Sequence, residues 1–444
     1  MPVILTDFIH QTSWVDLPPD VQRQARRCLL DTLGAVAGGR LLPVSAIIYD
    51  FAATHYGGEV PLWLDGRQAS PPGAALAHAT TIDGLDVHDG YNLTKGHAGV
   101  ALVPAVLATL GLGRAVVSGP ELLTALVVGY EVALRAGVAL HATAADYHTS
   151  GAWNALGCAA VTARRLGLTD AQTQHALGIA EYYGPRSPMM RCIDHPTMVK
   201  DGSGWGAMGG VSAGLLAADG FTGAPAETVI STEMAEVWAD LGQRWRIVEQ
   251  YFKPHAVCRW AQPAIEGALA VQRARRIDLA AVQRINVHTF HAAVRLATRR
   301  PQNTEEAQYS LPFPVAAALV HGRLGPQELS GAALSDPLTL RLAAAVELVE
   351  EPTYNERFPA ERFARVRVEL NDGTSYDSGE VQPGWDAEQP PTDDELQAKF
   401  RGLAATALPA ERVHALAETV WKCHDLDDVQ EIVDLLAAPI PKAL

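Results

Sequence analysis

The sequence lacks any close pair of cysteines and any run of basic residues. Its cysteines are odd in number, widely spaced and never in a C-x-x-C pair, which is typical of reduced thiols and not of a disulfide framework or a zinc knuckle. The N-terminal residues show no basic region followed by an apolar stretch, so we expect no signal peptide and a cytoplasmic location. The five cysteines are Cys28, Cys158, Cys192, Cys258 and Cys423.

The shortage of clustered positive charge argues against nucleic acid as a partner. The formal net charge is −15, whereas phosphate binding needs grouped lysines and arginines. The longest apolar stretch, roughly residues 99–112, is too short to span a bilayer, so we expect no membrane partner. With 48% hydrophobic and 19% charged residues over 444 positions, the chain can bury a large core, and its length favours two domains or one domain with an insertion.

Several common catalytic motifs are also missing. No G-x-S-x-G, P-loop or H-E-x-x-H occurs, so hydrolase, nucleotide-binding and zinc-protease functions lack support. The glycines of residues 202–210 resemble a dinucleotide fingerprint only superficially, because no strand precedes them. They indicate close helix packing instead, or the approach of backbone to a ligand at a helix N-terminus.

The first two-thirds of the chain predicts helix after helix. Residues 18–37 repeat apolar side chains at three-to-four spacing, with prolines suited to the first turn and a Gly-Gly pair at the end. We therefore predict an all-α domain here. Similar periods recur at 72–82, 99–112, 119–141, 150–166, 170–181, 206–219 and 261–273.

The pattern changes after about residue 275. Residues 282–290 and 363–370 alternate as strands do, and Asn371-Asp-Gly373 predicts a hairpin turn. Helical stretches at 312–323 and 336–349 lie between them, and a capping box at 392–395 starts a further helix. We predict a mainly α protein, in which a large all-α helical domain receives a smaller α+β lid domain as an insertion. The helical domain comprises residues 1–274 and 391–444, and the lid residues 275–390.

The most polar segment is residues 83–97, which includes Asp86, Thr94 and His97. Three carboxylates, two histidines, a lysine and three glycines do not build a core, so a tightly folded loop is expected. The alternatives are a solvated helix connection and a functional loop. Metal binding has little support, because Asp86-x-His88 and His97 match no recognised ligand spacing. We expect no metal.

Three further segments offer candidate residues. His148 stands at a helix entrance, where the helix dipole lowers imidazole basicity, although a structural histidine fits the same position. Lys200 follows two apolar residues and precedes Ser203, which indicates a partly buried ammonium or else a surface lysine. Lys253 and Arg259 flank a histidine beside aromatic residues and could bind an anion or be surface charge.

These segments resemble the MmgE/PrpD family nearly end to end. The resemblance rests on the order and spacing of short motifs, each weak alone. It implies a large helical domain with an α+β lid, commonly a homodimer, and activity on a di- or tricarboxylate without metal or organic cofactor. It implies active-site roles for Asp86, His97, His148, Lys200 and Lys253. The motifs are Asp31-Thr-Leu-Gly, Gly129-Tyr-Glu-Val, Arg165-Leu-Gly-Leu, Thr197-Met-Val-Lys200, Gly220-Phe-Thr-Gly, Phe252-Lys253-Pro and Asn371-Asp-Gly with Lys399-Phe.

The chain departs from the family pattern at three places. Phe313 stands where several members have an active-site tyrosine, Cys258 replaces a histidine, and Asp201-Gly-Ser-Gly replaces a Leu-His-Pro-Gly segment. The missing phenol and imidazoles remove groups that could protonate a leaving hydroxyl.

We therefore predict a metal-free and cofactor-free lyase of the dehydratase type that abstracts the proton α to a carboxylate of a small polycarboxylic acid. Epimerisation is the alternative, and a decarboxylase or a non-catalytic carboxylate-binding protein comes after it. Four residues are predicted to be catalytic, and five more to bind substrate in a cleft closed by the lid. The catalytic residues are His97, His148, Lys200 and Asp86, and the binding residues are Lys253, Thr94, Arg259, Phe313 and Ser203.

Overall fold

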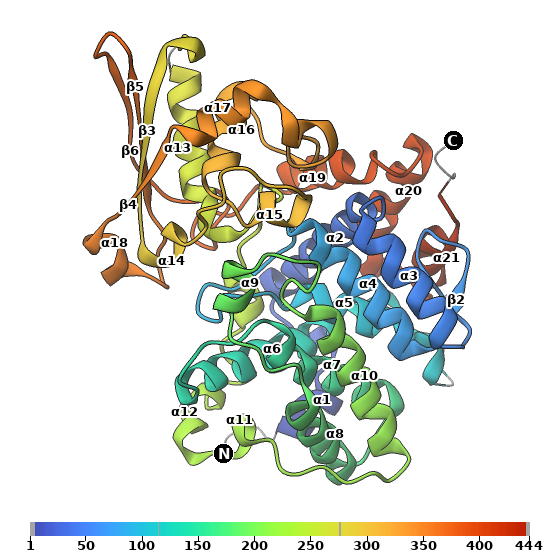
Figure 1. Cartoon of the computed structure of the whole chain (residues 1–444). Coiled ribbons are helices and arrows are strands. Elements are labelled where there is room, and N and C mark those ends of the chain that lie inside the picture. Colours follow the sequence, from blue (N-terminus) through green and yellow to red (C-terminus); the bar gives the residue numbers. More distant parts are fainter. Residues whose placement is uncertain (1–4, 114, 275–276, 441–444) are drawn as a thin grey trace. The chain divides into compact units, whose positions relative to one another are not determined.

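The structure is a computed structural model that describes residues 5–113, 115–274 and 277–440. The chain divides into two compact units (Figure 1). The first unit contains the chain up to Met189, Asp201–Phe252 and the stretch from Pro391 onward, and the second contains Met190–Lys200 and Lys253–Pro390. The domain limits predicted at 274/275 and 390/391 stay predictions.

The first unit is built from helices, with one pair of two-residue antiparallel strands, β1 (Val60–Pro61) and β2 (Gln68–Ala69). The spacing-based helices are confirmed to within a few residues, and α3 is a helix that the sequence pattern did not reveal. The helices are α1 (Leu5–Gln11), α2 (Pro19–Gly39), α3 (Pro43–His55), α4 (Pro71–Leu85), α5 (Gly99–Ala108), α6 (Gly119–Thr143), α7 (Gly151–Leu166), α8 (Asp170–Tyr183), α10 (Ser203–Ala218), α11 (Glu227–Ile230), α12 (Ala235–Trp238), α19 (Asp393–Ala404), α20 (Ala410–Trp421) and α21 (Gln430–Ala437).

Close packing of α7 against α10 explains the glycines that superficially resemble a nucleotide-binding motif. A Cβ on Gly210 would lie 2.3 Å from the carbonyl oxygen of Ala155, and one on Gly206 would lie 2.2 Å from Oδ1 of Asn154. Neither position has room for a side chain. The glycines therefore permit two helix backbones to approach each other, as one of the two sequence-based interpretations held.

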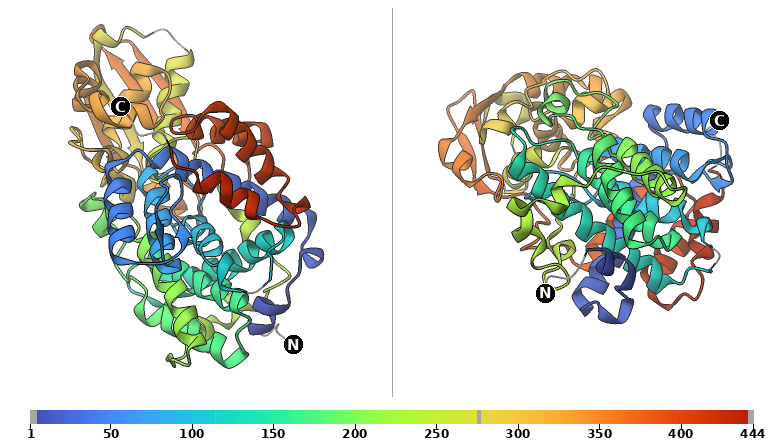
Figure 2. Two further views of the ribbon diagram at one scale, coloured as in Figure 1. Left: turned by 90° about the vertical axis from the view of Figure 1, so that its right-hand side faces the viewer. Right: turned by 90° about the horizontal axis from the view of Figure 1, so that it is seen from below.

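Helix α19, the first of the helices after residue 390, returns to pack along α2 in the same unit (Figure 1). The left-hand view of Figure 2 shows the C-terminal helices against the N-terminal ones from another side. The predicted capping box is present, since the Thr392 side chain accepts from the Glu395 N–H and the Glu395 side chain accepts from the Thr392 N–H.

Among the described residues, α6 alone is long and apolar enough to cross a membrane by length and composition, and the bent pair α2 and α3 passes the same test only if counted as one span. The expectation that residues 99–112 form the longest apolar stretch was therefore wrong. Nearly all of the apolar part of α6 is buried inside the structure, as in the core helix of a globular unit.

The second unit contains a four-stranded sheet in the order β4-β3-β5-β6 (Figure 1). β3 (Val282–Thr289) pairs parallel with β4 (Val346–Glu350) and antiparallel with β5 (Ala364–Leu370), and the predicted hairpin joins β5 to β6 (Ser375–Val381). Helix α13 (Gln262–Ala274) packs against β5 and β6. The remaining helices are α9 (Met190–Asp194), α14 (His291–Val294), α15 (Thr304–Gln308), α16 (Pro312–His321), α17 (Pro337–Ala344) and α18 (Pro352–Arg357).

The helix predicted over residues 336–349 was wrong at its end. α17 stops at Ala344, and the next residues form β4. The two valines of Val346-Glu-Leu-Val-Glu350 suit a strand, and pairing with β3 supplies its backbone hydrogen bonds. Tertiary pairing therefore decided a segment whose local pattern allowed both structures.

Candidate active site

The segment between α4 and α5 forms a buried loop and is not a solvated connection. Asp86, His88 and His97 are 3%, 0% and 7% exposed, respectively. Asp86 is the C-cap of α4 and has a left-handed backbone with φ of 51°. Such a conformation costs about 1 kcal/mol for a non-glycine residue and is common at functional sites. It directs the chain sharply away from the helix at the first residue of the site.

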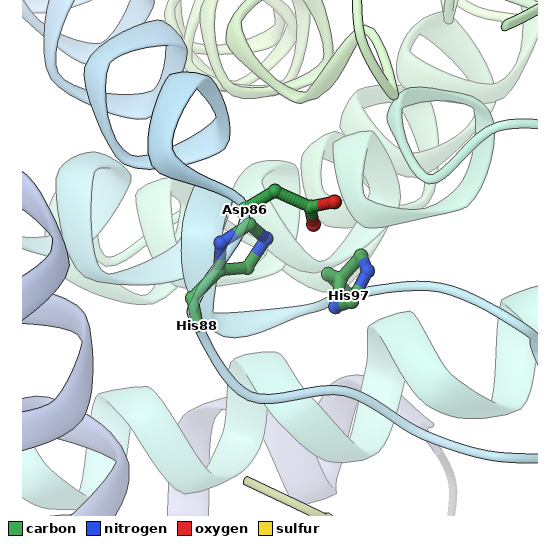
Figure 3. Close-up of side chains that lie close together, drawn as sticks. All are labelled: Asp86, His88 and His97. Atoms are coloured by element: carbon green, nitrogen blue, oxygen red, sulfur yellow. The ribbon is translucent and has the colours of Figure 1, made fainter. Parts of the chain in front are cut away.

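Asp86, His88 and His97 form one cluster (Figure 3). One ligand-type atom from each residue lies within 4.8 Å of the others. The centroids of the two imidazole rings are 4.5 Å apart, and the ring of Tyr251 meets that of His97 edge-on at 6.3 Å. The loop thus gathers two proton-transfer groups and a carboxylate in a buried space.

The tautomer of His97 follows from its contact with the backbone. Nδ1 lies 2.5 Å from the carbonyl oxygen of Asp89, and a carbonyl can only accept, so Nδ1 carries the proton. In the neutral ring, Nε2 is then the basic nitrogen. The His97 N–H donates to Ser150 Oγ, and Ser150 Oγ donates to Asp201 at 2.9 and 2.8 Å.

Asp201 lies beside the basic nitrogen of His97, with 4.0 Å between Oδ2 and Nε2. A carboxylate at this distance stabilises an imidazolium, so His97 can take up a proton at a modest electrostatic cost. Ser150 holds both the backbone of His97 and the carboxylate of Asp201. The arrangement has the components expected of a general base and a group that stabilises its protonated form.

Asp89 belongs to the same loop. Its carboxyl group is fully buried and accepts a hydrogen bond of 2.5 Å from the Tyr130 hydroxyl. Burial raises the pKa of Asp89 to about 7, and the Tyr130 hydrogen bond opposes that shift. Gly99 is required beside this pair, because a Cβ there would lie 2.0 Å from the Tyr130 hydroxyl oxygen.

Replacing Asp89 by Asn is expected to stabilise the protein increasingly as the pH rises. The pKa of Asp89 is raised on folding, so the folded state holds this proton up to about pH 7 while the unfolded chain releases it near pH 4. The wild type thus loses stability through this window, by on the order of 2 kcal/mol between pH 5 and pH 8, and the neutral variant does not. Thermal unfolding at several pH values measures the difference, and a pH-independent difference would contradict the assignment.

Asp86, His88 and His97 are also the residues that could hold a divalent cation, since two imidazoles and a carboxylate are common ligands. The sequence predicted no metal, and we expect the purified protein to contain no stoichiometric zinc or iron. Dialysis against a chelator should leave activity unchanged. Metal at one equivalent per chain, with activity that chelation removes and metal restores, would overturn this prediction.

Other predicted residues of the first unit lie in separate surroundings. His148 is partly exposed, its N–H donates to Nε2 of His141, and burial followed by the nearby Arg186 lowers its pKa. Two residues later Ser150 contacts His97, so the segment adjoins the cluster although none of the contacts described for His148 involves the cluster's side chains. Thr94 is buried and donates to the carbonyl oxygen of Tyr91 at 3.3 Å.

Ser203 begins α10, where its side chain is buried and its N–H donates to an oxygen of Asp83 at 3.3 Å. Asp83 precedes the site loop on α4, so this bond ties the start of α10 to the helix that carries Asp86.

The second unit holds the remaining predicted residues. Lys200 is 3% exposed, has a φ of 48°, donates to Oε1 of Gln308 and lies 4.9 Å from the Tyr309 ring centroid. Lys253 is fully buried. The interpretation of these two residues as surface lysines was wrong.

Arg259 is buried and pairs with Asp386 at 2.9 Å, so part of its guanidinium is already engaged. Phe313 is fully buried near the start of α16, and its N–H donates to Ser310 Oγ.

Three polar residues of the site were not predicted from the sequence. They are His88, which lies in the polar loop, and Ser150 and Asp201, which lie outside it. The signal was available for Asp201, since the departure from the family pattern after Lys200 places a carboxylate next to a predicted site residue. Ser150 gave no such signal, because a serine before an alanine-rich helix is ordinarily a cap.

An apolar cavity of about 380 Å³ lies elsewhere in the first unit. Leu5, Leu177, Val229 and Trp238 are among its lining residues, and it shares none with the cluster. Its lining contains no lysine or arginine, so it does not suit a polycarboxylate.

Comparison with known proteins reveals similarity over nearly the whole chain. Residues 3–237 match the MmgE/PrpD N-terminal domain and residues 255–424 match the MmgE/PrpD C-terminal domain. A cis-aconitate decarboxylase-like protein of Aspergillus oryzae is 25% identical, over 98% of this chain and 97% of its own length. The Homo sapiens cis-aconitate decarboxylase is also 25% identical, over 98% of this chain and 94% of its own length. A mitochondrial 2-methylcitrate dehydratase of Yarrowia lipolytica is 29% identical, but only over 22% of this chain and 20% of its own length.

Proposed function

Because this chain belongs to the MmgE/PrpD family, we propose that it is a lyase of the dehydratase type that acts on a small di- or tricarboxylic acid. The observation that supports this most directly is the buried cluster in which His97 has a fixed tautomer and Asp201 beside its basic nitrogen. The relatives that are named as decarboxylases or as a dehydratase support a lyase reaction on a small carboxylic acid.

The reaction begins with removal of the proton α to a substrate carboxylate. In the proposed mechanism Nε2 of His97 accepts this proton, and Asp201 stabilises the imidazolium that forms. The electron pair left on carbon delocalises into the carboxylate, so the site has to neutralise additional negative charge. Lys200 and Lys253 are proposed to bind substrate carboxylates for this purpose, since fixed charge in a dry site is often the largest catalytic contribution.

Elimination also needs an acid for the leaving group. In the dehydratase reaction the electron pair forms the double bond, the C–O bond breaks and the hydroxide leaves as water after gaining a proton. His148 is proposed to supply that proton. Its pKa is lowered by burial and by Arg186, which makes the protonated form a readier proton donor.

The proposal is tested by incubating the enzyme with a panel of di- and tricarboxylates in deuterium oxide and following the products by NMR. Elimination gives an unsaturated acid, and we expect this with at least one β-hydroxy acid of the panel. Deuterium incorporation without net change would indicate the epimerase instead, and release of carbon dioxide a decarboxylase. Binding of acids with neither exchange nor product would contradict an enzymatic role.

The second candidate is an epimerase of a dicarboxylate, in which two groups exchange a proton on opposite faces of one carbon. The observation that favours it is Phe313, which is buried and has no hydroxyl where several family members have a tyrosine. Without that phenol, a leaving hydroxyl has one proton donor fewer, while proton exchange at carbon is unaffected.

Restoring the phenol is therefore expected to move the outcome toward elimination. Phe313→Tyr should raise the ratio of unsaturated product to deuterium exchange while changing KM little, because the new group donates a proton and does not bind a carboxylate. The ratio is read from the same NMR experiment, with Phe313→Leu as the control for altered packing. An equal ratio of unsaturated product to deuterium exchange in both variants would contradict a role of residue 313 in choosing between elimination and epimerisation.

The wider features of the proposal stay predictions. They are the absence of any cofactor, the homodimer, the cytoplasmic location and the role of residues 275–390 as a lid.

A further inference from the structure

Lys399 lies in helix α19, far along the chain from the candidate site, but its side chain reaches the loop of that site. Its side chain is 6% exposed, and its ammonium donates to Oδ1 of Asp31 at 2.5 Å and to the carbonyl oxygen of Val87 at 2.6 Å. Asp31 belongs to α2, and its side chain is fully buried. A lysine in such surroundings is held by charge-assisted hydrogen bonds and is not free to sample rotamers.

The Val87 carbonyl is part of the backbone that joins Asp86 to His88. The orientation of this peptide group therefore affects the directions in which both side chains leave the main chain. Asp86 already has a left-handed φ, so the chain turns at this point against its ordinary preference. A fixed donor on the carbonyl between the two residues is a direct means of holding that turn.

Lys399 connects two segments of the first unit. Its ion-pair partner Asp31 belongs to α2, and the carbonyl oxygen of Val87 belongs to the loop that also carries Asp89. The backbone of Asp89 also accepts the Nδ1 proton of His97. One buried ammonium is thus hydrogen-bonded to the loop at Val87, two residues before the carbonyl group that orients His97.

We propose that Lys399 is a positioning residue: held by Asp31, it fixes the Val87 carbonyl and thereby sets the geometry of Asp86 and His88 in the site. The consequence for catalysis rests on the proposed function, whereas the geometric effect on the histidines does not. The competing explanation is that the Lys399–Asp31 pair only stabilises the packing of α19 on α2.

Removal of Lys399 alone is a poor test, because it leaves the Asp31 carboxylate buried without this cation and can unfold the protein. The informative pair of variants is Asp31→Asn and the double variant Asp31→Asn/Lys399→Met. The first keeps the ammonium and its bond to Val87. The double variant removes both charges, so it is expected to fold, but it lacks the donor to the loop. Arg401→Met, at an exposed position of the same helix, is the matched control.

The double variant is expected to have a kcat about tenfold or more below that of Asp31→Asn, with KM little changed, since a small misplacement of catalytic groups is costly. Its thermal midpoint should stay close to that of Asp31→Asn. Arg401→Met should match the wild type in kcat. A double variant with the kcat of Asp31→Asn would overturn the proposal and leave a packing role only.

A second measurement is independent of any substrate. Imidazole signals from ¹⁵N-histidine-labelled protein, assigned with His88→Gln and His97→Gln, should move for His88 in the double variant and stay in place in Arg401→Met. If no acid of the panel reacts with the wild type, the proposed function fails, and the spectra alone decide this inference. Unmoved His88 signals in a folded double variant would then overturn it.

Discussion

Replacing His97 by Gln is expected to lower the turnover number by roughly 10²-fold or more, the usual contribution of a general base. The side-chain amide of Gln can still donate an N–H to the Asp89 carbonyl oxygen, so the loop keeps its hydrogen bond. It has no nitrogen that can accept the substrate proton. The loss should therefore appear in kcat while substrate binding is largely retained, and steady-state kinetics on the reacting acid measures it.

His78→Gln is the matched control, because His78 is also a fully buried histidine with a backbone contact. Its Nε2 accepts the N–H of Trp63 at 3.0 Å, and its ring stacks on that tryptophan. The control is expected to lose stability and keep its turnover. His148→Gln should give a loss similar to that of His97→Gln if the two histidines act as base and acid. Near-normal activity in both His97→Gln and His148→Gln would contradict the proposed mechanism, in which these histidines act as base and acid.

Lys200→Met is expected to lower kcat/KM roughly 10- to 150-fold. This factor corresponds to about 1.5–3 kcal/mol of transition-state stabilisation, the usual range for a hydrogen bond to a charged group. Gln308 and the Tyr309 ring hold the ammonium at a fixed position, so its binding to a carboxylate costs little side-chain entropy. Met has a similar length and no charge. Competitive inhibition by an unreactive dicarboxylate should weaken in parallel.

Lys422→Met is the control for the lysine variants, since Lys422 forms an exposed pair with Glu418 and should contribute little. Lys253→Met is expected to behave like Lys200→Met. Kinetics and inhibitor affinity equal to those of the wild type in either lysine variant would contradict its role in binding the substrate.

The helices could be predicted well because their apolar spacing agrees with their burial. The helix at 18–37 is observed as α2, and the 392–395 capping box starts α19. The strand β4 could not be predicted, because five residues of Val, Glu and Leu suit a helix as well as a strand until a neighbour pairs with them.

The site could be predicted in part, and for chemical reasons. Asp86 and His97 stood out because so many polar residues in one short segment cannot form a core. Ser150 and Asp201 could not be connected to His97 from spacing, since their contacts join residues 53 and 51 positions apart. Lys399 was visible only as part of a family motif, and its reach to Val87 depends on how two distant helices pack.

Asp31 and Lys399 are 368 positions apart in the sequence, and this separation has a consequence for biosynthesis. At about 5–20 residues per second, a ribosome needs roughly 20 to 70 s to make the intervening chain. During that time α2 has been made but lacks the helix that covers it and the ammonium that pairs with its buried carboxylate. The nascent chain therefore passes through a stage in which the surface of α2 that α19 covers is exposed. A chain terminated just before Pro391 would remain at that stage.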